Sequence, residues 1–380
     1  MFSAGACSFS VGSKVRCLEA LLGDKENARF LVGTTSLQQP NQIHVLDFDS
    51  AANEVTRTQV YAHPSQVQEL APSPFAKDLV VTCGKRVGER AVATLWRMDD
   101  LSNGGGGEER AGGVESPTPL VVLTELPQQK LPVSSVAWNV GDESATATLA
   151  SAHGTALRTW SLLVGGSEAT VQDKLELDVS LASSPTAVGA LRWDPHHPNY
   201  VSYTLGGSVQ TWDTRAKSVA FAVEDAHLQA ALDIDYNPNK PFCLASGGDD
   251  GKLKFWDLRQ ARQPLLALAA HAHWVWSVRY NRFHDQLVLS ASSDSTLALW
   301  RVSSISSAPI VELDEQDFMS EAAAGADVVD TNVRRYAEHE DSVYAVAWGA
   351  SDSWLFGSVS FDGRFCVNHV PSTEKYKILL

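Results

Sequence analysis

Residues 271–301 read HAHWVWSVRYNRFHDQLVLSASSDSTLALWR, and the pattern in these residues identifies the architecture of the protein. Three short runs in it, Trp276–Tyr280, Gln286–Ser290 and Thr296–Trp300, are rich in apolar, aromatic or β-branched residues. Polar turns separate the runs, so the segment predicts three antiparallel strands of one sheet. A histidine opens the segment and a tryptophan closes its last strand, and both marks recur elsewhere in the chain.

The position that closes such a strand recurs along the whole chain, mostly as tryptophan. The seven positions are Leu46, Trp96, Trp160, Trp212, Trp256, Trp300 and Asn368, with gaps of 50, 64, 52, 44, 44 and 68 residues. An aromatic residue precedes five of them by 19 to 22 residues, at Trp138, Trp193, Tyr236, Tyr280 and Trp348. A unit of about 40–45 residues with four strands and a final Trp-Asp pair is typical of a WD40 blade. The pattern therefore predicts an all-β fold, a seven-bladed WD40 β-propeller.

We expect residues 1–380 to form one such propeller, interrupted by two surface insertions. The first, near residues 102–117, contains a run of four glycines. The second, near residues 312–332, is rich in Asp and Glu and has no Lys or Arg between Glu312 and Asp330. Both compositions are typical of solvated loops. Because a closed ring leaves no free sheet edge, we expect the C-terminal segment Tyr376–Leu380 to be an outer strand beside the N-terminal segment.

Composition narrows the range of partners. A net charge of −15 opposes binding to nucleic acid and to anionic membranes, and favours proteins with basic surfaces. No stretch is long and apolar enough to insert into a membrane, the N-terminus lacks the features of a secretory signal, and the five scattered cysteines fit reduced thiols. We expect a monomer on its own.

Three units carry the same set of polar residues, which could be mistaken for catalytic triads. The sets are His227, Ser246, Asp250 and Trp256; His271, Ser290, Asp294 and Trp300; and His339, Ser358 and Asp362, with Asn368 in the last place. Three copies of one active site in a chain would be unusual, whereas a buried hydrogen-bond chain repeated in each blade is the expected structural device. The sequence also lacks a phosphate-binding loop, a nucleophile elbow and a cluster of metal ligands. We therefore expect no catalytic residue, no cofactor and no metal.

A protein-binding surface is expected where the strands begin at the central channel. If Val275 and Val343 pack between blades, strand alternation turns their neighbours toward the rim of the channel. The candidate residues are Gln66, Gln68, Asp249, Trp274, Trp276, Ser293, Ser342, Tyr344 and Phe361. Aromatic residues on a concave polar rim make good interface anchors. The alternative is that Trp274 and Trp276 pack between blades.

Several runs resemble one WD-repeat family, the EARP and GARP complex-interacting proteins. They include Arg29–Thr34, Asn237–Lys240, His273–Trp276, His284–Leu287 and Glu338–Val346, and they spread over nearly the whole chain. The resemblance implies a non-catalytic adaptor that binds subunits of the EARP and GARP vesicle-tethering complexes and supports endosomal recycling and endosome-to-Golgi retrograde transport. It also implies a cytoplasmic protein, peripheral at the trans-Golgi network and endosomes through its partners. The chain departs from the pattern in blades two to four, which lack the His-Asp pair.

A second interpretation comes from another class of protein. Trp212-Asp213-Thr214-Arg215 and Trp256-Asp257-Leu258-Arg259 match the W-D-x-R pattern of propellers that act as substrate receptors for cullin-type ubiquitin ligases. In that case Arg215 and Arg259 would contact the ligase adaptor. The alternative for each arginine is a local hydrogen bond at a strand turn.

Overall fold

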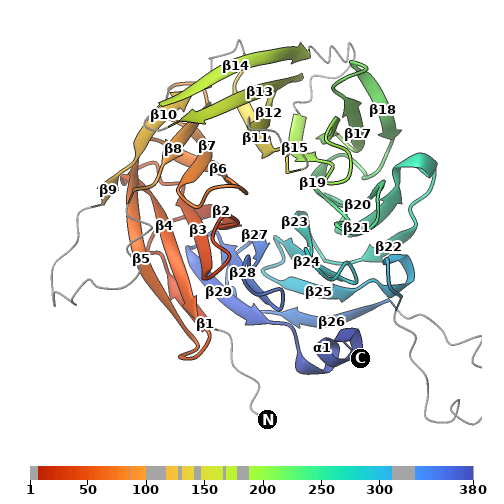
Figure 1. Ribbon diagram of the computed structural model, residues 1–380. Coiled ribbons are helices and arrows are strands. Elements are labelled where there is room, and N and C mark those ends of the chain that lie inside the picture. Colours follow the sequence, from red (N-terminus) through yellow and green to blue (C-terminus); the bar gives the residue numbers. More distant parts are fainter. Residues whose placement is uncertain are drawn as a thin grey trace, which may run out of the picture.

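The computed structural model describes residues 7–86, 88–99, 117–126, 131–140, 147–165, 168–177, 188–309 and 330–379, without the side chains of residues 163–177. Within these residues the strands form seven sheets arranged radially around a common axis (Figure 1). The seven-bladed propeller expected from the repeat is thereby confirmed.

Each blade is numbered here from its innermost strand outward. Blade 1 contains β2 (Val15–Ala20), β3 (Ala28–Thr34), β4 (Asn41–Asp49) and β5 (Glu54–His63), and blade 2 contains β6 (Gln66–Pro72), β7 (Leu79–Lys85), β8 (Val92–Arg97) and β10 (Val121–Glu125). Blade 3 contains β11 (Val133–Trp138), β12 (Ala147–His153), β13 (Ala156–Gly165) and β14 (Glu168–Leu177), and blade 4 contains β15 (Val188–Trp193), β16 (Tyr200–Leu205), β17 (Ser208–Asp213) and β18 (Ser218–Val223). Blade 5 contains β19 (Ala231–Tyr236), β20 (Cys243–Gly248), β21 (Lys252–Asp257) and β22 (Leu266–Ala269), and blade 6 contains β23 (Val275–Tyr280), β24 (Leu287–Ser292), β25 (Leu297–Arg301) and β26 (Thr331–Tyr336). Blade 7 contains β27 (Val343–Trp348), β28 (Leu355–Ser360), β29 (Arg364–His369) and β1 (Cys7–Ser10).

The repeat marks occupy equivalent places in these sheets. All seven positions that close a repeat, from Leu46 to Asn368, lie in the third strand of a blade. The five preceding aromatic residues are each the last residue of an innermost strand. Two independent sequence periods therefore fall in one register, and this is why the blades could be counted from the sequence.

The hydrophobic core lies between neighbouring blades rather than inside any one of them. Each of the seven contacts has its own cluster of buried residues, for example Ile43, Tyr61 and Val67 between blades 1 and 2. The spacing is tight, because a Cβ added at Gly33 would lie 2.6 Å from Cγ1 of Val67. A single blade could not bury its own apolar faces, so the ring folds by stacking.

The innermost strands are also joined by polar contacts. The Nε1–H of Trp138 donates to the Ala71 carbonyl at 2.8 Å, and that of Trp193 donates to the Ala137 carbonyl at 2.9 Å. Trp348 makes the same kind of bond, at 3.1 Å, to the carbonyl of Arg279. The second aromatic mark therefore joins one blade to the blade before it.

The prediction for the closing strand was wrong. The outer strand of blade 7 is β1, from the N-terminus, which pairs antiparallel with β29. Most of the C-terminal segment belongs instead to a helix, α1 (Ser372–Leu379), attached by a buried ion pair of 3.0 Å between Arg301 and Glu374. Because β1 already covers the edge of β29, no edge is left there for the C-terminal residues to pair with.

The expected insertions fall largely outside the described residues, which omit 100–116 and 310–329. Directly after the first, β9 (Thr118–Pro119) adds a short parallel strand to the outer edge of blade 1, against Tyr61 and Ala62. After the second, Thr331 and Asn332 belong to β26 and pair with Arg301 and Trp300. Two short 3₁₀ helices, η1 (Leu258–Gln260) and η2 (Ser303–Ile305), follow the third strands of blades 5 and 6.

Candidate protein-binding rim

The rim of the central channel is shaped by a bulge in every innermost strand. In each blade the pairing of the first two strands shifts register near the start of the innermost strand, as between Val275 and Ser277. A β-bulge re-aims the side chain of its extra residue. The residues enclosed by these shifts are Arg16, Gln68, Ser134, Gly189 with Ala190, Leu232, Trp276 and Tyr344.

Bulky residues at these bulges gather on one side of the ring. Trp276 of blade 6 and Tyr344 of blade 7 have ring centroids 4.9 Å apart. The series continues to Trp274 at 5.5 Å from Trp276 and to Phe361 at 5.6 Å from Tyr344. We call these four residues the aromatic strip. Blades 3 and 4 have only Ser134, Gly189 and Ala190 at the bulge, so the rim is strongly asymmetric.

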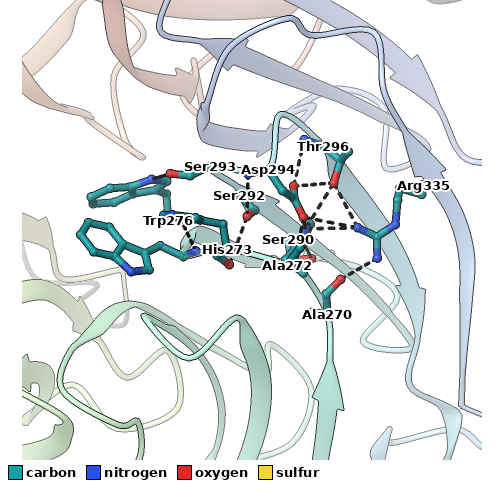
Figure 2. A network of polar contacts seen from close by, with 12 residues as sticks. Ala270, Ala272, His273, Trp276, Ser290, Ser292, Ser293, Asp294, Thr296 and Arg335 are labelled. Atoms are coloured by element: carbon teal, nitrogen blue, oxygen red, sulfur yellow. Dashed lines mark hydrogen bonds and ion pairs between the residues drawn. The ribbon is translucent and has the colours of Figure 1, made fainter.

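The aromatic strip is partly open to solvent. Trp274 is 44% exposed, while Trp276, Tyr344 and Phe361 are half-buried. The Nε1–H of Trp276 donates to Oγ of Ser293 at 2.5 Å, which fixes the indole at the rim (Figure 2). Trp276 therefore contacts aromatic residues and a turn hydroxyl, while Val275 and Val343 are fully buried between blades.

Sequence reasoning missed two residues of this surface, Lys14 and Arg16. The Arg16 guanidinium lies 4.6 Å from the ring centroid of Tyr344 and 5.8 Å from that of Trp276. The Lys14 ammonium lies 4.9 Å from the ring of Phe361. Both positions come from blade 1, so the rim site joins three blades.

A backbone contact shows the equivalence that the sequence concealed. The N–H of Thr35 donates to the Lys14 carbonyl, as the N–H of Ser293 does to the Trp274 carbonyl and that of Phe361 does to the Ser342 carbonyl. Lys14 and Arg16 thus occupy in blade 1 the places of Trp274 and Trp276 in blade 6. Blade 1 has neither the histidine nor the aromatic mark, so spacing could not align it. A signal was nevertheless present, because Val15-Arg16-Cys17-Leu18 and Val275-Trp276-Ser277-Val278 share a Val-x-small-apolar pattern.

The remaining candidates lie near the same rim, and Ser342 is next to the aromatic strip because its carbonyl accepts from the N–H of Phe361. Gln68 is exposed, and Gln66, Asp249 and Ser342 are half-buried. A carboxylate oxygen of Asp249 accepts from the N–H of Gln229 at 3.2 Å, and the N–H of Ser342 donates to Asp341 at 2.7 Å. These groups surround the strip rather than extend its stacking.

The polar sets of blades 5 and 6 form continuous hydrogen-bond chains. In blade 5 the Trp256 indole donates to Ser246 at 2.9 Å, Ser246 meets Nε2 of His227 at 2.8 Å, and Nδ1 of His227 meets Asp250 at 2.8 Å. This order assigns the proton on Nδ1 to the bond with the carboxylate. Burial lowers the pKa of His227, which favours the neutral imidazole. The indole, the hydroxyl, the imidazole and the carboxylate each have a partner in this chain. The serine hydroxyl is held between an indole and an imidazole, away from the channel.

In blade 6 the corresponding distances are 2.9 Å from the Trp300 indole to Ser290, 2.8 Å from Ser290 to His271, and 3.0 Å from His271 to Asp294. Burial raises the pKa of Asp294, but hydrogen bonds from His271 and Thr296 outweigh it and hold that pKa below its usual range. Arg335 of β26 adds an ion pair of 3.6 Å to Asp294, so the turn is tied to the outer strand (Figure 2).

Blade 7 departs from the expected set. Nε2 of His339 meets Ser358 at 2.8 Å, but its Nδ1 meets Ser360 at 2.8 Å, and Ser360 in turn donates to Asp362 at 2.5 Å. The direct His339–Asp362 contact that the spacing predicted is replaced by a hydroxyl relay, because Ser360 lies between the two groups. The Nδ2 of Asn368 is buried and has no hydrogen-bond partner among the described residues.

Blades 2 and 3 keep part of the same hydrogen-bond chain. In blade 2 Thr82 accepts from the Trp96 indole at 2.8 Å and meets His63 at 3.0 Å. In blade 3 Ser151 accepts from the Trp160 indole at 2.7 Å and meets the ring of His153 at 2.8 Å. His153 lies within the second strand, so a search for histidine ahead of the blade misses it.

The channel below the rim contains a belt of charged residues that are mostly paired with one another. The cavity has a volume of about 370 Å³, and its lining includes Glu19, Glu69, Arg192, Asp235 and Arg279. Arg279 forms ion pairs with Glu19 at 3.2 Å and with Asp233, while Asp233 also pairs with Arg192 at 3.2 Å. Burial raises the pKa of Glu69 to about 7 and that of Asp235 to about 6. Glu69 also bridges two blades by accepting from the N–H of Val136 at 3.0 Å.

The arginines of the W-D-x-R pattern lie on turns after the third strands. Arg259 donates twice to Asp257, at 2.9 and 2.7 Å, and its guanidinium lies 5.1 Å from the Phe242 ring centroid. Arg215 is exposed, and its backbone N–H donates to Oδ1 of Asp213 at 2.8 Å. For Arg259 the structure thus shows the local bond that the spacing also allowed.

Metal ligands and membrane-spanning helices can be assessed for the described part of the chain only. No group of three or more His, Cys, Asp or Glu side chains in those residues could hold a metal ion. No helix among the described residues is long and apolar enough to cross a membrane.

Comparison with known proteins identifies the family. The profile described as "EIPR1 beta-propeller" matches residues 3–300, and a "WD domain, G-beta repeat" profile matches residues 330–367. The chain is 37% identical over 380 residues to "EARP and GARP complex-interacting protein 1" of Homo sapiens, covering 97% of each chain. It is 29% identical to "EARP-interacting protein 1" of Caenorhabditis elegans, covering 98% of each, and 29% identical to "WD repeat-containing protein DWA2" of Arabidopsis thaliana, covering 96% of this chain and 97% of the relative. The chain therefore belongs to the EIPR1 β-propeller family, and the resemblance inferred from its sequence runs is confirmed.

Proposed function

We propose that this protein is a non-catalytic adaptor that binds subunits of the EARP and GARP vesicle-tethering complexes through the aromatic strip. In this role it supports endosomal recycling and endosome-to-Golgi retrograde transport. It acts in the cytoplasm, at endosomes and the trans-Golgi network, where its partners hold it.

The aromatic strip carries this proposal. Tryptophan and tyrosine supply large contact areas with few rotatable bonds, and they dominate the binding energy of many protein interfaces. Here four rings from two blades contact one another at the channel rim, and the strip includes a tryptophan that is 44% exposed. Because the rings are already held in place, little ordering cost is paid on binding. The names of the relatives support this choice of partner, since several are called EARP- or GARP-interacting proteins.

The catalytic alternative has little support in the geometry. The serine of each complete polar set accepts an indole N–H and contacts a histidine that is itself bonded to aspartate. The three groups are thus engaged with one another in a hydrogen-bond chain that ends on a buried tryptophan.

The test is recovery of tether subunits with purified variants. Replacing Trp274 by Ala should weaken co-purification of EARP and GARP subunits by about 30-fold, the size expected when an interface tryptophan is lost. Phe283→Ala is a matched control, because Phe283 is 59% exposed on the turn between β23 and β24, at the opposite end of the inner strand. Unchanged recovery with Trp274→Ala, in a variant that melts like the parent, would show that the aromatic strip does not bind the tether.

A further inference from the structure

The aromatic strip is continuous with two exposed cations that have no acidic partner among the described residues. Lys14 and Arg16 are both exposed, and neither forms an ion pair there. Their contacts are with ring faces instead, at 4.6 Å from Arg16 to Tyr344 and 4.9 Å from Lys14 to Phe361. A cation over an aromatic face keeps its charge and its hydrogen-bond donors available. The rim therefore presents positive charge on a chain whose net charge is −15.

Three acidic residues near the same rim make contacts of their own. Asp249 accepts from the N–H of Gln229, and Asp341 accepts from the N–H of Ser342. Glu340 forms an ion pair of 3.3 Å with Arg364. None of these contacts involves Lys14 or Arg16.

The positive charge continues onto blade 2. Lys85 ends β7 directly opposite Gln66 of β6 and is exposed. Around the rim, blades 6 and 7 thus carry aromatic rings, the contact of blades 7 and 1 carries aromatic rings with cations, and blade 2 carries a cation with amide side chains. The features follow one another along an arc.

We propose that the rim binds an extended acidic segment of a protein partner. Apolar side chains of that segment would pack against Trp274 and Trp276, and its carboxylates would pair with Arg16, Lys14 and Lys85. This inference rests on the proposed function, and it names the chemistry of the partner segment. An extended segment suits the site because the contact groups come from successive blades along the arc rather than from one deep cavity. Arginine held against aromatic rings is pre-organised to receive a carboxylate, so the charge contact adds affinity at low ordering cost.

An anionic membrane is the less favoured partner for the same cations. A net charge of −15 repels a negatively charged bilayer, and the electrostatic attraction of a few exposed cations falls off within a Debye length of about 10 Å at 0.1 M salt. A peptide segment can reach the cations without bringing a large negative surface near the rest of the molecule.

The experiment uses the full chain and overlapping peptides that tile the subunits of the EARP and GARP complexes. Bound peptides should be acidic, and Arg16→Gln should weaken their binding on the order of tenfold, with a larger loss for Arg16→Glu. Raising the salt concentration should weaken peptide binding by the parent more than peptide binding by Arg16→Gln, because the variant has lost part of the electrostatic interaction that salt screens. Arg262→Glu is the matched control, since Arg262 is an exposed arginine on the turn between η1 and β22.

Each outcome separates this inference from the proposed function. If the intact tether complexes bind but the bound peptides are basic or neutral, the acidic-segment inference is wrong while the proposed function stands. The same holds if the complexes bind and Arg16→Glu binds the peptides as the parent does. That inference is equally wrong if the complexes bind and no peptide does, because a folded surface is then the partner. If neither complexes nor peptides bind the parent, the proposed function itself fails. If the protein binds vesicles rich in anionic lipid, this binding depends on Arg16, and no acidic peptide binds, the cations would be assigned to a membrane instead.

Discussion

Two tryptophans at equivalent positions differ in whether their indole N–H is satisfied. In blade 5 the Trp256 indole donates to Ser246 at 2.9 Å. In blade 4 the Trp212 indole is buried without a partner among the described residues, because Ser202 is engaged with Thr211 and Tyr236, each at 2.6 Å. The same repeat position therefore carries a hydrogen bond in one blade and an unpaired donor in the next.

This difference predicts unequal costs for one substitution. Trp256→Phe should lower the free energy of unfolding by about 1–2 kcal/mol more than Trp212→Phe, because only the first change removes a buried hydrogen bond. The comparison is internally controlled, since both changes remove a similar volume from the third strand of a blade. Chemical denaturation of the two variants measures it, and equal shifts of the midpoint would contradict the role assigned to Ser246.

The contact between β1 and β29 closes the ring. Four residue pairs join them, from Cys7 with Val367 to Ser10 with Arg364. Phe9 and Cys7 also pack against the core between blades 7 and 1. The ring is thus closed by strands from the two ends of the chain, held by non-covalent contacts.

Deleting residues 1–10 should therefore destabilise the protein and expose the edge of β29. We expect the free energy of unfolding to fall by about 2 kcal/mol or more, from the lost burial of Phe9 and the lost strand pairing. The free edge should also promote association, which light scattering would detect. Leu379→Ala is the control at the other terminus, because that side chain is 62% exposed. A truncated chain that unfolds at the parent's midpoint and stays monodisperse would show that β1 does not stabilise the ring.

Across the propeller as a whole, buried histidines couple stability to pH. Burial lowers the pKa of His63, His153 and His339 to about 4 each, whereas an unfolded histidine titrates near 6.5. At these histidines the unfolded chain therefore takes up protons first, so their contribution to stability is constant above about pH 6.5 and falls as the pH drops toward 4. Glu69 acts in the opposite direction, because burial raises its pKa to about 7 and its folded form gains a proton before the unfolded form does.

We expect the melting temperature to decrease from pH 6.5 to 4, and His339→Gln to reduce the steepness of that decrease. His273→Gln is the control, since His273 is exposed at the rim. In Glu69→Gln, stability relative to the parent should rise as the pH increases from about 4.5 to 7, because the variant has no carboxylate to ionise in the buried belt. Melting curves across this range give both results, and parallel profiles for the parent and both variants would disprove the linkage.

Local patterns in the sequence are enough to predict how many blades the protein has. The strand-closing position recurs in all seven blades, and the aromatic residue that ends the inner strand recurs in five of them. Strand alternation, which is a local property, also predicted Tyr344 at the rim, and it left Trp276 open between the rim and the packing between blades. The polar sets of blades 5 and 6 could be read in the same way, from spacing alone.

What closes the ring and what completes the rim depend instead on contacts between distant parts of the chain. β1 and β29 are separated by almost the whole chain, so no local pattern could choose the N-terminal segment over the C-terminal one. Arg16 meets Trp276 and Tyr344 for the same reason, because closure brings blade 1 against blades 6 and 7. A net charge sums over the chain and says nothing of where charges gather, so the cationic rim of this acidic protein became visible only when the ring was closed.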